Sequence, residues 1–221
     1  MNMKKNIAIF LCDITGVMAK PWVEAGYEAI LVDPQHPEGV TAEGLVTKVG
    51  HIIGHDVTWS VLREAIQTRR VAFVAGFPPC TDLAVSGARW FQAKRDADPA
   101  VQFKAMQVVW QCQSIGEMSG APWFLENPVS QISSLCRKPD HSFHPHDFTG
   151  YCANDNYTKK TCLWVGGGFI MPAPFRDEAL GAPDNRIHQA TPGPDRANFR
   201  SATPEGFARA VFLANHKGLD E

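Results

Sequence analysis

The sequence of 221 residues contains no uninterrupted apolar run of the roughly 18 to 20 residues that a membrane-spanning helix requires. The apolar run near the start is broken at Asp13, too early for the core of a secretory signal, and we interpret it as a first strand. No block of basic residues is present, and the net charge is −2. The chain therefore lacks the electrostatic footprint that drives binding to duplex DNA. The sequence predicts no association with membranes, and the expected compartment is the cytoplasm.

Paired Cys-x-x-Cys motifs are also absent, although the chain has six cysteines. So few cysteines in a chain of this length do not predict a disulfide framework, and we expect reduced thiols. A group of metal-ligating residue types falls within about seventeen residues and has two interpretations, a zinc site or a polar loop. The polar loop is favoured and no metal is predicted, because a paired cysteine motif is missing. The group consists of Cys136, His141, His144, His146 and Cys152.

Strand-like and helix-like segments alternate along the chain, and its apolar content of 44% suits one core. Apolar, β-branched and aromatic runs predict strands at 5–12, 27–33, 51–53, 70–76 and 122–126. Periodicity predicts helices at 18–26, 58–68, 99–118 and 204–215, with extended loop from 166 to the last of them. We therefore predict an α/β fold with a doubly wound, mostly parallel sheet. The predicted single domain, 1–221, comprises a core at 1–165, a loop-rich segment at 166–203 and a C-terminal helix at 204–221.

Two short motifs follow or end neighbouring predicted strands. Residues 76–82 read Gly-Phe-Pro-Pro-Cys-Thr-Asp, and residues 126–128 read Glu-Asn-Pro. Because ligands of an open parallel sheet bind beyond the carboxyl ends of its strands, we expect Cys80 and Glu126 at one edge of the sheet. The two prolines before the thiol restrict the backbone, so the loop has little entropy left to lose.

Methyl transfer to carbon 5 of cytosine requires such a pair of side chains. Carbon 5 is a poor nucleophile until another nucleophile adds to carbon 6, and Cys80 suits this step because a thiolate attacks strongly and leaves easily. The addition is easier when ring nitrogen N3 gains hydrogen at the same time. Glu126 would supply that hydrogen if burial and the bound base raise the pKa of its carboxyl group.

Acidic residues after the first two strands suit a ligand that carries hydroxyl groups. In a doubly wound sheet, the loop after strand one approaches the ligand, and an acid at the end of strand two accepts hydrogen bonds from ribose. Asp33 follows Asp13 by about 20 residues, which fits this pattern. The alternative for Asp33 is an Asp-Pro turn.

Segments along almost the whole chain resemble the cytosine-C5 DNA methyltransferases, most closely a compact form common among phage and prophage proteins. The matching segments are 13–16, 25–33, 54–57, 77–90, 125–128, 158–164 and 200–208. The resemblance implies a Rossmann-like methyltransferase fold, a bacterial host cell and S-adenosylmethionine as methyl donor, with Cys80 as nucleophile and Glu126 gripping the base edge. It implies that the donor binds at Asp13, Gly16, Asp33, Asp56 and Phe77, and the substrate at Pro78, Pro79, Ser86, Asn127, Lys159 and Lys160.

Several of these residues have a second interpretation. Asp56 resembles the position that receives the adenine amino group, and the alternative is an N-cap of the following helix. Lys159 and Lys160 precede a strand-like run, where they would either neutralise a substrate phosphate or flank an edge strand. For Asn127 we favour a role in orienting Glu126 or satisfying backbone groups over direct contact with substrate.

Two kinds of residue near these motifs are expected in the core. The large ring of Trp90 favours a place in the core over a platform for stacked bases. Three cysteines are neither the expected nucleophile nor members of the Cys/His group, and we expect them as small core residues. They are Cys12, Cys112 and Cys162.

One segment that such enzymes usually have is missing. Sequence-specific enzymes of this kind carry a long target-recognition segment, whereas only about 40 residues separate Trp164 from Thr203, so no large target-recognition domain is predicted. Three hypotheses follow: methylation of cytosine in DNA with relaxed specificity or with recognition supplied by a partner protein or oligomer, the same chemistry on a free cytosine nucleotide such as dCMP, or a non-catalytic DNA-binding relative. We favour methyl transfer over the non-catalytic hypothesis because Cys80 and Glu126 are both present, and we favour DNA over the free nucleotide as substrate.

Overall fold

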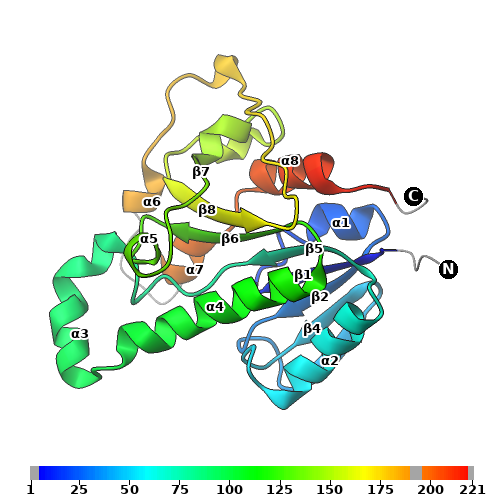
Figure 1. The fold of residues 1–221 in the computed structure, drawn as a ribbon. Helices are drawn as coiled ribbons and strands as arrows, with labels where there is room; N and C mark the ends of the chain where they lie inside the picture. Colours follow the sequence, from blue (N-terminus) through cyan, green and yellow to red (C-terminus); the bar gives the residue numbers. More distant parts are fainter. Residues whose placement is uncertain (1–4, 190–195, 219–221) are drawn as a thin grey trace.

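The computed structural model describes residues 5–189 and 196–218. Eight strands form one sheet (Figure 1): β1 (Ile7–Leu11), β2 (Glu28–Val32), β3 (Val40–Glu43), β4 (Val46–Val49), β5 (Val71–Gly76), β6 (Trp123–Pro128), β7 (His141–Phe143) and β8 (Thr161–Gly166). The order is β3-β4-β2-β1-β5-β6-β8-β7. The strands from β4 to β6 in this order pair in parallel, while β3, β8 and β7 pair antiparallel with their neighbours. A mixed α/β fold with a mostly parallel sheet is therefore confirmed.

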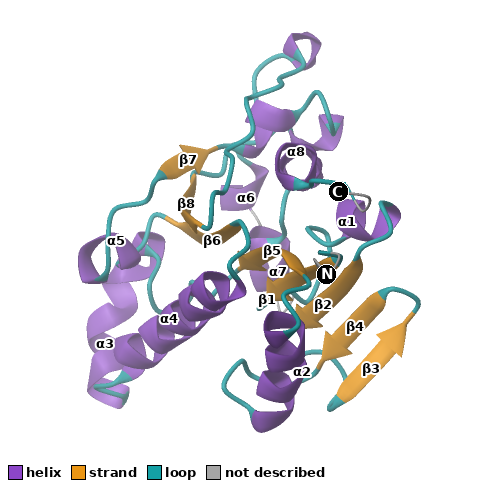
Figure 2. Ribbon diagram, turned by 45° about the vertical axis from the view of Figure 1, so that its right-hand side comes forward, coloured by secondary structure: helices purple, strands orange, loops and turns teal. Residues whose placement is uncertain are grey.

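Helices cover both faces of this sheet (Figure 2). One face packs against α2 (Asp56–Gln67) and α4 (Val101–Ser119), and the other packs against α1 (Lys20–Glu24) and α8 (Glu205–Asn215). The shorter helices are α3 (Phe91–Ala97), α5 (Ile132–Leu135), α6 (Arg186–Gln189) and α7 (Arg196–Ser201), and the 3-10 helices are η1 (Val85–Trp90), η2 (Pro145–Phe148), η3 (Ala153–Asp155) and η4 (Glu178–Leu180). Within the described ranges, no helix is both long and apolar enough to cross a membrane.

The central strand β1 is buried along its whole length, because helices cover both faces of the sheet. Its Ile-Ala-Ile-Phe-Leu sequence is accordingly a continuous apolar run. Alternate side chains enter the two layers of the core: Ile9 packs on the side of α2 and α4, and Phe10 packs on the side of α1 and α8. In the second layer, Trp22 stacks on Phe73 with 4.6 Å between ring centroids. The two layers fix the positions of the strand ends that carry the candidate site.

Helix α4 approaches the sheet closely at two glycines. A Cβ atom on Gly76 would lie 2.9 Å from Cβ of Cys112, and one on Gly116 would lie 2.6 Å from Cγ of Trp123. These contacts hold the C-terminal half of α4 against β5 and β6. The N-terminal half continues past the sheet, and α3 lies at its far end (Figure 1). We call η1, α3 and this half of α4, residues 85–108, the arm.

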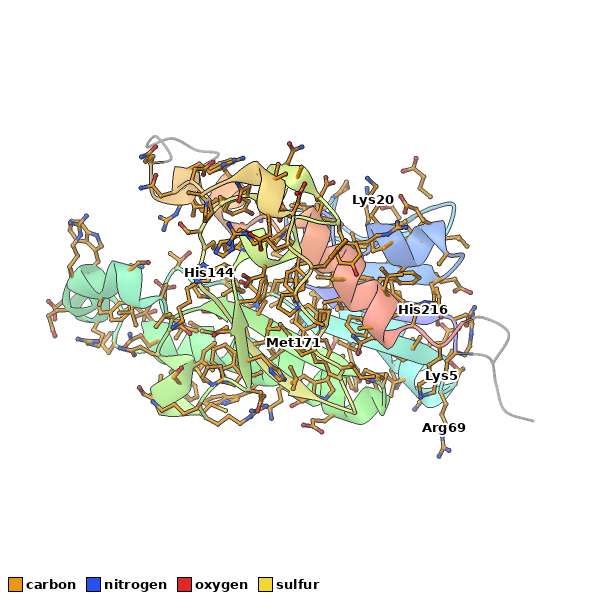
Figure 3. The ribbon with its side chains drawn as sticks, turned by 90° about the horizontal axis from the view of Figure 1, so that it is seen from above. Lys5, Lys20, Arg69, His144, Met171 and His216 are labelled. Atoms are coloured by element: carbon orange, nitrogen blue, oxygen red, sulfur yellow. The ribbon has the colours of Figure 1, made fainter. Side chains whose placement is uncertain are left out.

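The arm lies at the edge of the sheet where the parallel strands end. Figure 3 shows Lys5 and Arg69, which precede β1 and β5, at the opposite end of the molecule from the helices of the arm. Cys80 follows β5 and therefore belongs to the edge that carries the arm. This is the edge at which ligands bind in open parallel sheets.

The predicted strand at 51–53 is wrong. The chain instead forms the hairpin of β3 and β4 around Gly44, whose φ of 58° suits a tight turn, and residues 51–53 form the turn before α2. Strand β4 pairs in parallel with β2. Its Val-Thr-Lys-Val sequence is short and only partly apolar, so the local pattern does not distinguish it from a loop.

Three further expectations need correction. The segment after 166 contains α6 and α7 as well as the predicted α8, and its residues 190–195, like 219–221 at the C-terminus, lie outside the described residues. The expected polar loop around 136–152 contains the strand β7 and the 3-10 helix η2. Trp90 is not in the core, because 56% of its surface is exposed at the end of η1, where a short 3-10 helix turns its ring outward.

Candidate active site

The structure brings Cys80 and Glu126 to one region of the sheet edge. Strand β5 ends at Gly76, and Cys80 follows it after the two prolines, of which Pro78 is buried and Pro79 exposed. Glu126 lies in β6, which pairs in parallel with β5. Both side chains are half-buried. The loop that carries Cys80, residues 77–84, is therefore a direct neighbour of the strand that carries Glu126; we call it the nucleophile loop after the role expected for Cys80.

A buried amide fastens the nucleophile loop to β6. Asn127 is 1% exposed, and its Nδ2 donates a hydrogen bond of 2.8 Å to the carbonyl oxygen of Pro78. After Cys80, the loop is fastened again where the N–H of Val85 donates to the carbonyl of Val129 at 2.9 Å. Asn127 thus satisfies a backbone group, which matches the role that we favoured from the sequence. The contact fixes the position of the thiol relative to Glu126.

Glu126 has an incomplete hydrogen-bond environment. Its Oε1 atom is enclosed and has no hydrogen-bond partner among the described residues. Burial raises the pKa of its carboxyl group above the usual value, and the charge of Lys159 opposes this rise. Leaving a buried acceptor unpaired costs about 1–3 kcal/mol. A ligand that donates a hydrogen bond to this oxygen would remove that cost.

The thiol of Cys80 experiences the same surroundings. Burial raises the pKa of Cys80, and the negative charge of Glu126 raises it further. Lys159 and Arg200 lower this pKa and so favour the thiolate. Because the negative charge of Glu126 opposes ionisation of the Cys80 thiol, a state in which the pair holds one proton is preferred over one in which both groups are ionised.

The two adjacent lysines before β8 have different surroundings. The charge of Lys159 lowers the pKa of both Cys80 and Glu126, so its ammonium group faces the candidate site. Lys160 is exposed, and its charge instead lowers the pKa of His144. Successive residues of an extended chain point to opposite sides, which explains the difference. The structure thus brings Lys159, but not Lys160, to the pair of Cys80 and Glu126.

Arg200 is a site residue that our sequence reasoning missed. It lies in α7 and is half-buried, and its enclosed Nε atom has no hydrogen-bond partner in the part of the chain that the structure describes. The chain after α7 is tied to the site, because Nζ of Lys159 donates to the carbonyl of Ala202 at 3.4 Å. The signal available in the sequence was the place of Arg200 in the matching segment 200–208. Its role depends on the path of the chain after β8, which no local pattern gives.

The proposed donor side lies at the ends of β1 and β2. Oδ1 of Asp13 accepts hydrogen bonds from the N–H groups of Thr15 (2.9 Å) and Gly16 (2.8 Å), whereas its Oδ2 is buried and has no partner within residues 5–189 and 196–218. Burial raises the pKa of Asp13, and the charge of Asp33 adds to the effect. Asp33 is buried, and its Oδ1 accepts from the N–H of Gln35 at 2.8 Å, so the turn interpretation also describes its local contacts. The structure brings the two carboxyl groups together.

Asp56 lines a separate pocket. This pocket of about 470 Å³ lies between α2 and α4, and Trp59 and Trp110 are among its lining residues. The volume is within the range of small-molecule sites. The alternative role of Asp56 as an N-cap is wrong, because the cap is His55, whose Nδ1 accepts from the N–H of Val57 at 3.2 Å.

Phe77 and Ser86 have different positions relative to the pair. The N–H of Phe77 donates to the carbonyl of Leu11 at 2.9 Å, and its ring packs edge-to-face on Phe124 with 5.8 Å between centroids. Phe77 therefore joins the end of β1 to the nucleophile loop. Ser86 is exposed on η1, at the start of the arm.

The group of cysteines and histidines at 136–152 is held by local contacts. The rings of His144 and His146 stack at 5.2 Å between centroids, Cys136 is exposed, and Sγ of Cys152 lies 3.9 Å from Oε2 of Glu205. Among the residues that the structure describes, no group of three or more His, Cys, Asp or Glu side chains is arranged to hold a metal ion.

All six cysteines are free thiols. Cys112 and Cys162 are buried, as expected for small core residues. Cys12 is half-buried and has a φ of 58°, in the left-handed region that few residues other than glycine adopt, so it forms part of the turn after β1 rather than the core interior.

Comparison with known proteins adds no family to these observations. No protein-family model matches the chain, and a search of curated proteins found no match. The resemblance to cytosine-C5 methyltransferases therefore rests on the residues and motifs described above.

Proposed function

We propose that this protein is a cytosine-C5 methyltransferase that uses S-adenosylmethionine and acts on DNA. The observation that carries the proposal is the pairing of Cys80 with Glu126 at neighbouring strands, with an enclosed Glu126 oxygen that lacks a hydrogen-bond partner. A thiol beside such a carboxyl group suits the addition of sulfur to carbon 6 while N3 gains hydrogen.

One proton shared by the pair makes the chemistry possible. Its transfer from the Cys80 thiol to Glu126 gives a thiolate beside a neutral acid, which no longer opposes the thiolate charge. The acid then donates its hydrogen to N3 of cytosine as the sulfur adds to carbon 6. Lys159 and Arg200 stabilise the negative charge on sulfur before the addition. These cations offset the desolvation that raises the thiol pKa.

Carbon 5 of the adduct is electron-rich and accepts the methyl group. S-adenosylmethionine, when bound, supplies this group from a positively charged sulfonium centre. Loss of the carbon 5 proton to solvent then returns electrons to the ring, the carbon–sulfur bond breaks, and N3 gives its proton back to Glu126. Cys80 leaves as thiolate, so the pair regains its starting charge and proton count.

The donor side fits a ligand that is rich in hydrogen-bond donors and carries positive charge. Oδ2 of Asp13 is a buried acceptor without a partner, and Asp33 lies beside it at the next strand end. Hydroxyl and ammonium groups of S-adenosylmethionine would satisfy these oxygens. Asp56 and the pocket that it lines would hold the adenine ring, with Trp59 and Trp110 as aromatic walls.

Transfer to free dCMP is the second candidate. The net charge of −2 and the lack of a basic run favour it, because a free nucleotide needs no groove contacts. Lys159 and Arg200 would then bind the nucleotide phosphate rather than serve the thiolate alone. Both candidates use the same chemistry and differ in what surrounds the base.

The test is incubation with methyl-labelled S-adenosylmethionine and, in parallel, duplex DNA, single-stranded DNA and dCMP. We expect label in cytosine for the wild type, none for Cys80→Ser, and unchanged labelling for Cys136→Ser, an exposed thiol remote in sequence from the nucleophile loop. DNA containing 5-fluorocytosine should give a covalent complex after methyl transfer, since fluorine replaces the proton that must leave. Full turnover by the Cys80→Ser variant would refute the nucleophilic role.

A further inference from the structure

An exposed aromatic side chain and a cation lie just beyond the nucleophile. Trp90 is 56% exposed, and the guanidinium carbon of Arg89 lies 5.0 Å from the centroid of its ring. Arg89 is also exposed, and no carboxylate pairs with it among the described residues. Because a surface tryptophan with a large exposed face is uncommon, this pair calls for a binding partner.

Two exposed valines extend this surface toward Glu126. Val85 is 51% exposed and Val129 is 44% exposed, and a hydrogen bond between their backbones holds them together. Val129 directly follows the Glu-Asn-Pro motif, and Val85 begins the 3-10 helix that ends at Trp90. We call Val85, Arg89, Trp90 and Val129 the rim. The bond between Val85 and Val129 thus joins the start of the arm to the residue that follows β6.

The rim is fixed relative to the thiol. Nζ of Lys94, in α3, donates to the carbonyl of Thr81 at 2.8 Å and to Oδ1 of Asp82 at 2.6 Å. The N–H of Ala84 donates to the carbonyl of Cys80 at 2.8 Å. The residues on either side of Trp90 are therefore bonded to the nucleophile loop. A ligand that touches the rim is positioned with respect to Cys80.

The chemistry of the rim suits a nucleotide chain. An exposed indole face stacks on a base, an unpaired guanidinium pairs with a phosphate, and small apolar side chains contact sugar and base edges. A peptide partner would need carboxylates or main-chain pairing, and the rim offers only one cation and no free strand edge. The lack of a basic run excludes a long duplex tract but not a few contacts to an unpaired strand.

We propose that the rim binds the nucleotide next to the target cytosine in an unpaired stretch of DNA, with Trp90 stacked on its base and Arg89 on the adjoining phosphate. The inference rests on the proposed function and extends it, because it selects single-stranded or locally opened DNA over free nucleotide and over closed duplex. The target base then enters the pocket at Cys80, while its neighbour remains on the rim.

The test measures binding separately from chemistry. A fluorescent single-stranded DNA of about 12 nucleotides with one central cytosine is titrated without donor, and its anisotropy is followed, since one stacked base is typically worth roughly 5- to 100-fold in affinity. We expect Trp90→Ala to weaken binding by such a factor. We expect Arg89→Ala to weaken binding and to reduce the salt slope by about 0.7, the value for one phosphate contact on a single strand.

Matched controls lie on the same arm. Phe103→Ala removes an exposed aromatic ring (58%) of α4, and Arg95→Ala removes a guanidinium of α3 that bonds to Gln92 and Gln102. Neither should change DNA affinity, and circular dichroism establishes that all four variants fold. Three results would each overturn the proposal that the rim binds DNA. The Trp90 variant could bind as tightly as the wild type, the controls could lose as much affinity as the rim variants, or the wild type could bind no single-stranded DNA. Binding that depends on Trp90 without any methyl transfer would overturn the proposed function and leave the rim intact.

Discussion

Replacing Glu126 with Gln should separate the chemistry of the site from its stability. The new side chain keeps the size and the hydrogen-bonding capacity of Glu126 but lacks the carboxyl proton that we propose is given to N3. General-acid assistance is typically worth about a hundredfold to ten-thousandfold, or roughly 3 to 5 kcal/mol in the barrier. We therefore expect turnover at saturating donor to fall by such a factor.

The effect of the same substitution on stability should have the opposite sign. Burial raises the pKa of Glu126 in the folded protein, so the folded state binds this proton more tightly than the unfolded chain does. Wild-type stability therefore falls as the pH rises through the folded pKa, and the E126Q variant lacks this loss. We expect the variant to unfold with a higher free energy than the wild type at pH 8, because the wild type then buries a carboxylate charge and the variant buries a neutral amide. The difference should shrink at pH 5.

Three measurements on one preparation decide the outcome: methyl transfer at saturating donor, calorimetry of donor binding, and urea unfolding at pH 5 and pH 8. The control is Glu64→Gln, an exposed residue of α2 that should change none of them. Donor affinity should move little in E126Q, because Asp13 and Asp33 are assigned to that ligand. A variant that loses donor binding while keeping its rate would show that Glu126 does not contact the base. Loss of stability at both pH values would show that Glu126 is a structural residue.

Three further substitutions test the contacts around the site. Asn127→Ala leaves the carbonyl of Pro78 without its donor, so urea unfolding should show a loss of about 1–3 kcal/mol and turnover should fall with donor affinity unchanged; normal turnover would mean that the loop is held by other contacts. Burial raises the pKa of Asp155 to about 6, so wild-type stability should decrease as the pH rises from about 4 to above 6, and thermal melts of Asp155→Asn should lack this slope; equal slopes would place the titration elsewhere. Gly76→Ala puts a methyl group 2.8 Å from Cδ2 of Leu125, so urea unfolding should show a loss of about 1–3 kcal/mol in the free energy of unfolding. An unchanged midpoint would mean that Leu125 and α4 move aside at little cost.

The sequence predicts those elements whose local pattern is strong. The run at β1 is apolar on both faces, and the helix predicted at 99–118 is observed as Val101–Ser119 with Gly120 after it, because periodicity and a glycine both indicate its end. The hairpin of β3 and β4 was not predicted, since its pairing with β2 depends on residues far along the chain.

The candidate site was predictable to a similar extent. The motifs around Cys80 and Glu126 indicate the chemistry, and the order of parallel strands places the two groups at one edge. The separation of Lys159 from Lys160 follows from the alternation of an extended chain and was available from the sequence. The approach of Arg200 and the exposure of Trp90 were not, because both depend on how segments without a strong pattern cross the end of the sheet.

The close contacts at Gly76 and Gly116 anchor one half of α4 to the sheet and leave the other half to extend beyond it. Its C-terminal half cannot slide along the sheet, because backbone and side chains already touch where a Cβ atom would otherwise stand. Its N-terminal half extends past the sheet edge and carries α3, whose Lys94 is bonded to the residues just after Cys80. A partner that binds the arm would therefore contact an element that is anchored at Gly76, a few residues before Cys80, and bonded at Thr81, directly after it.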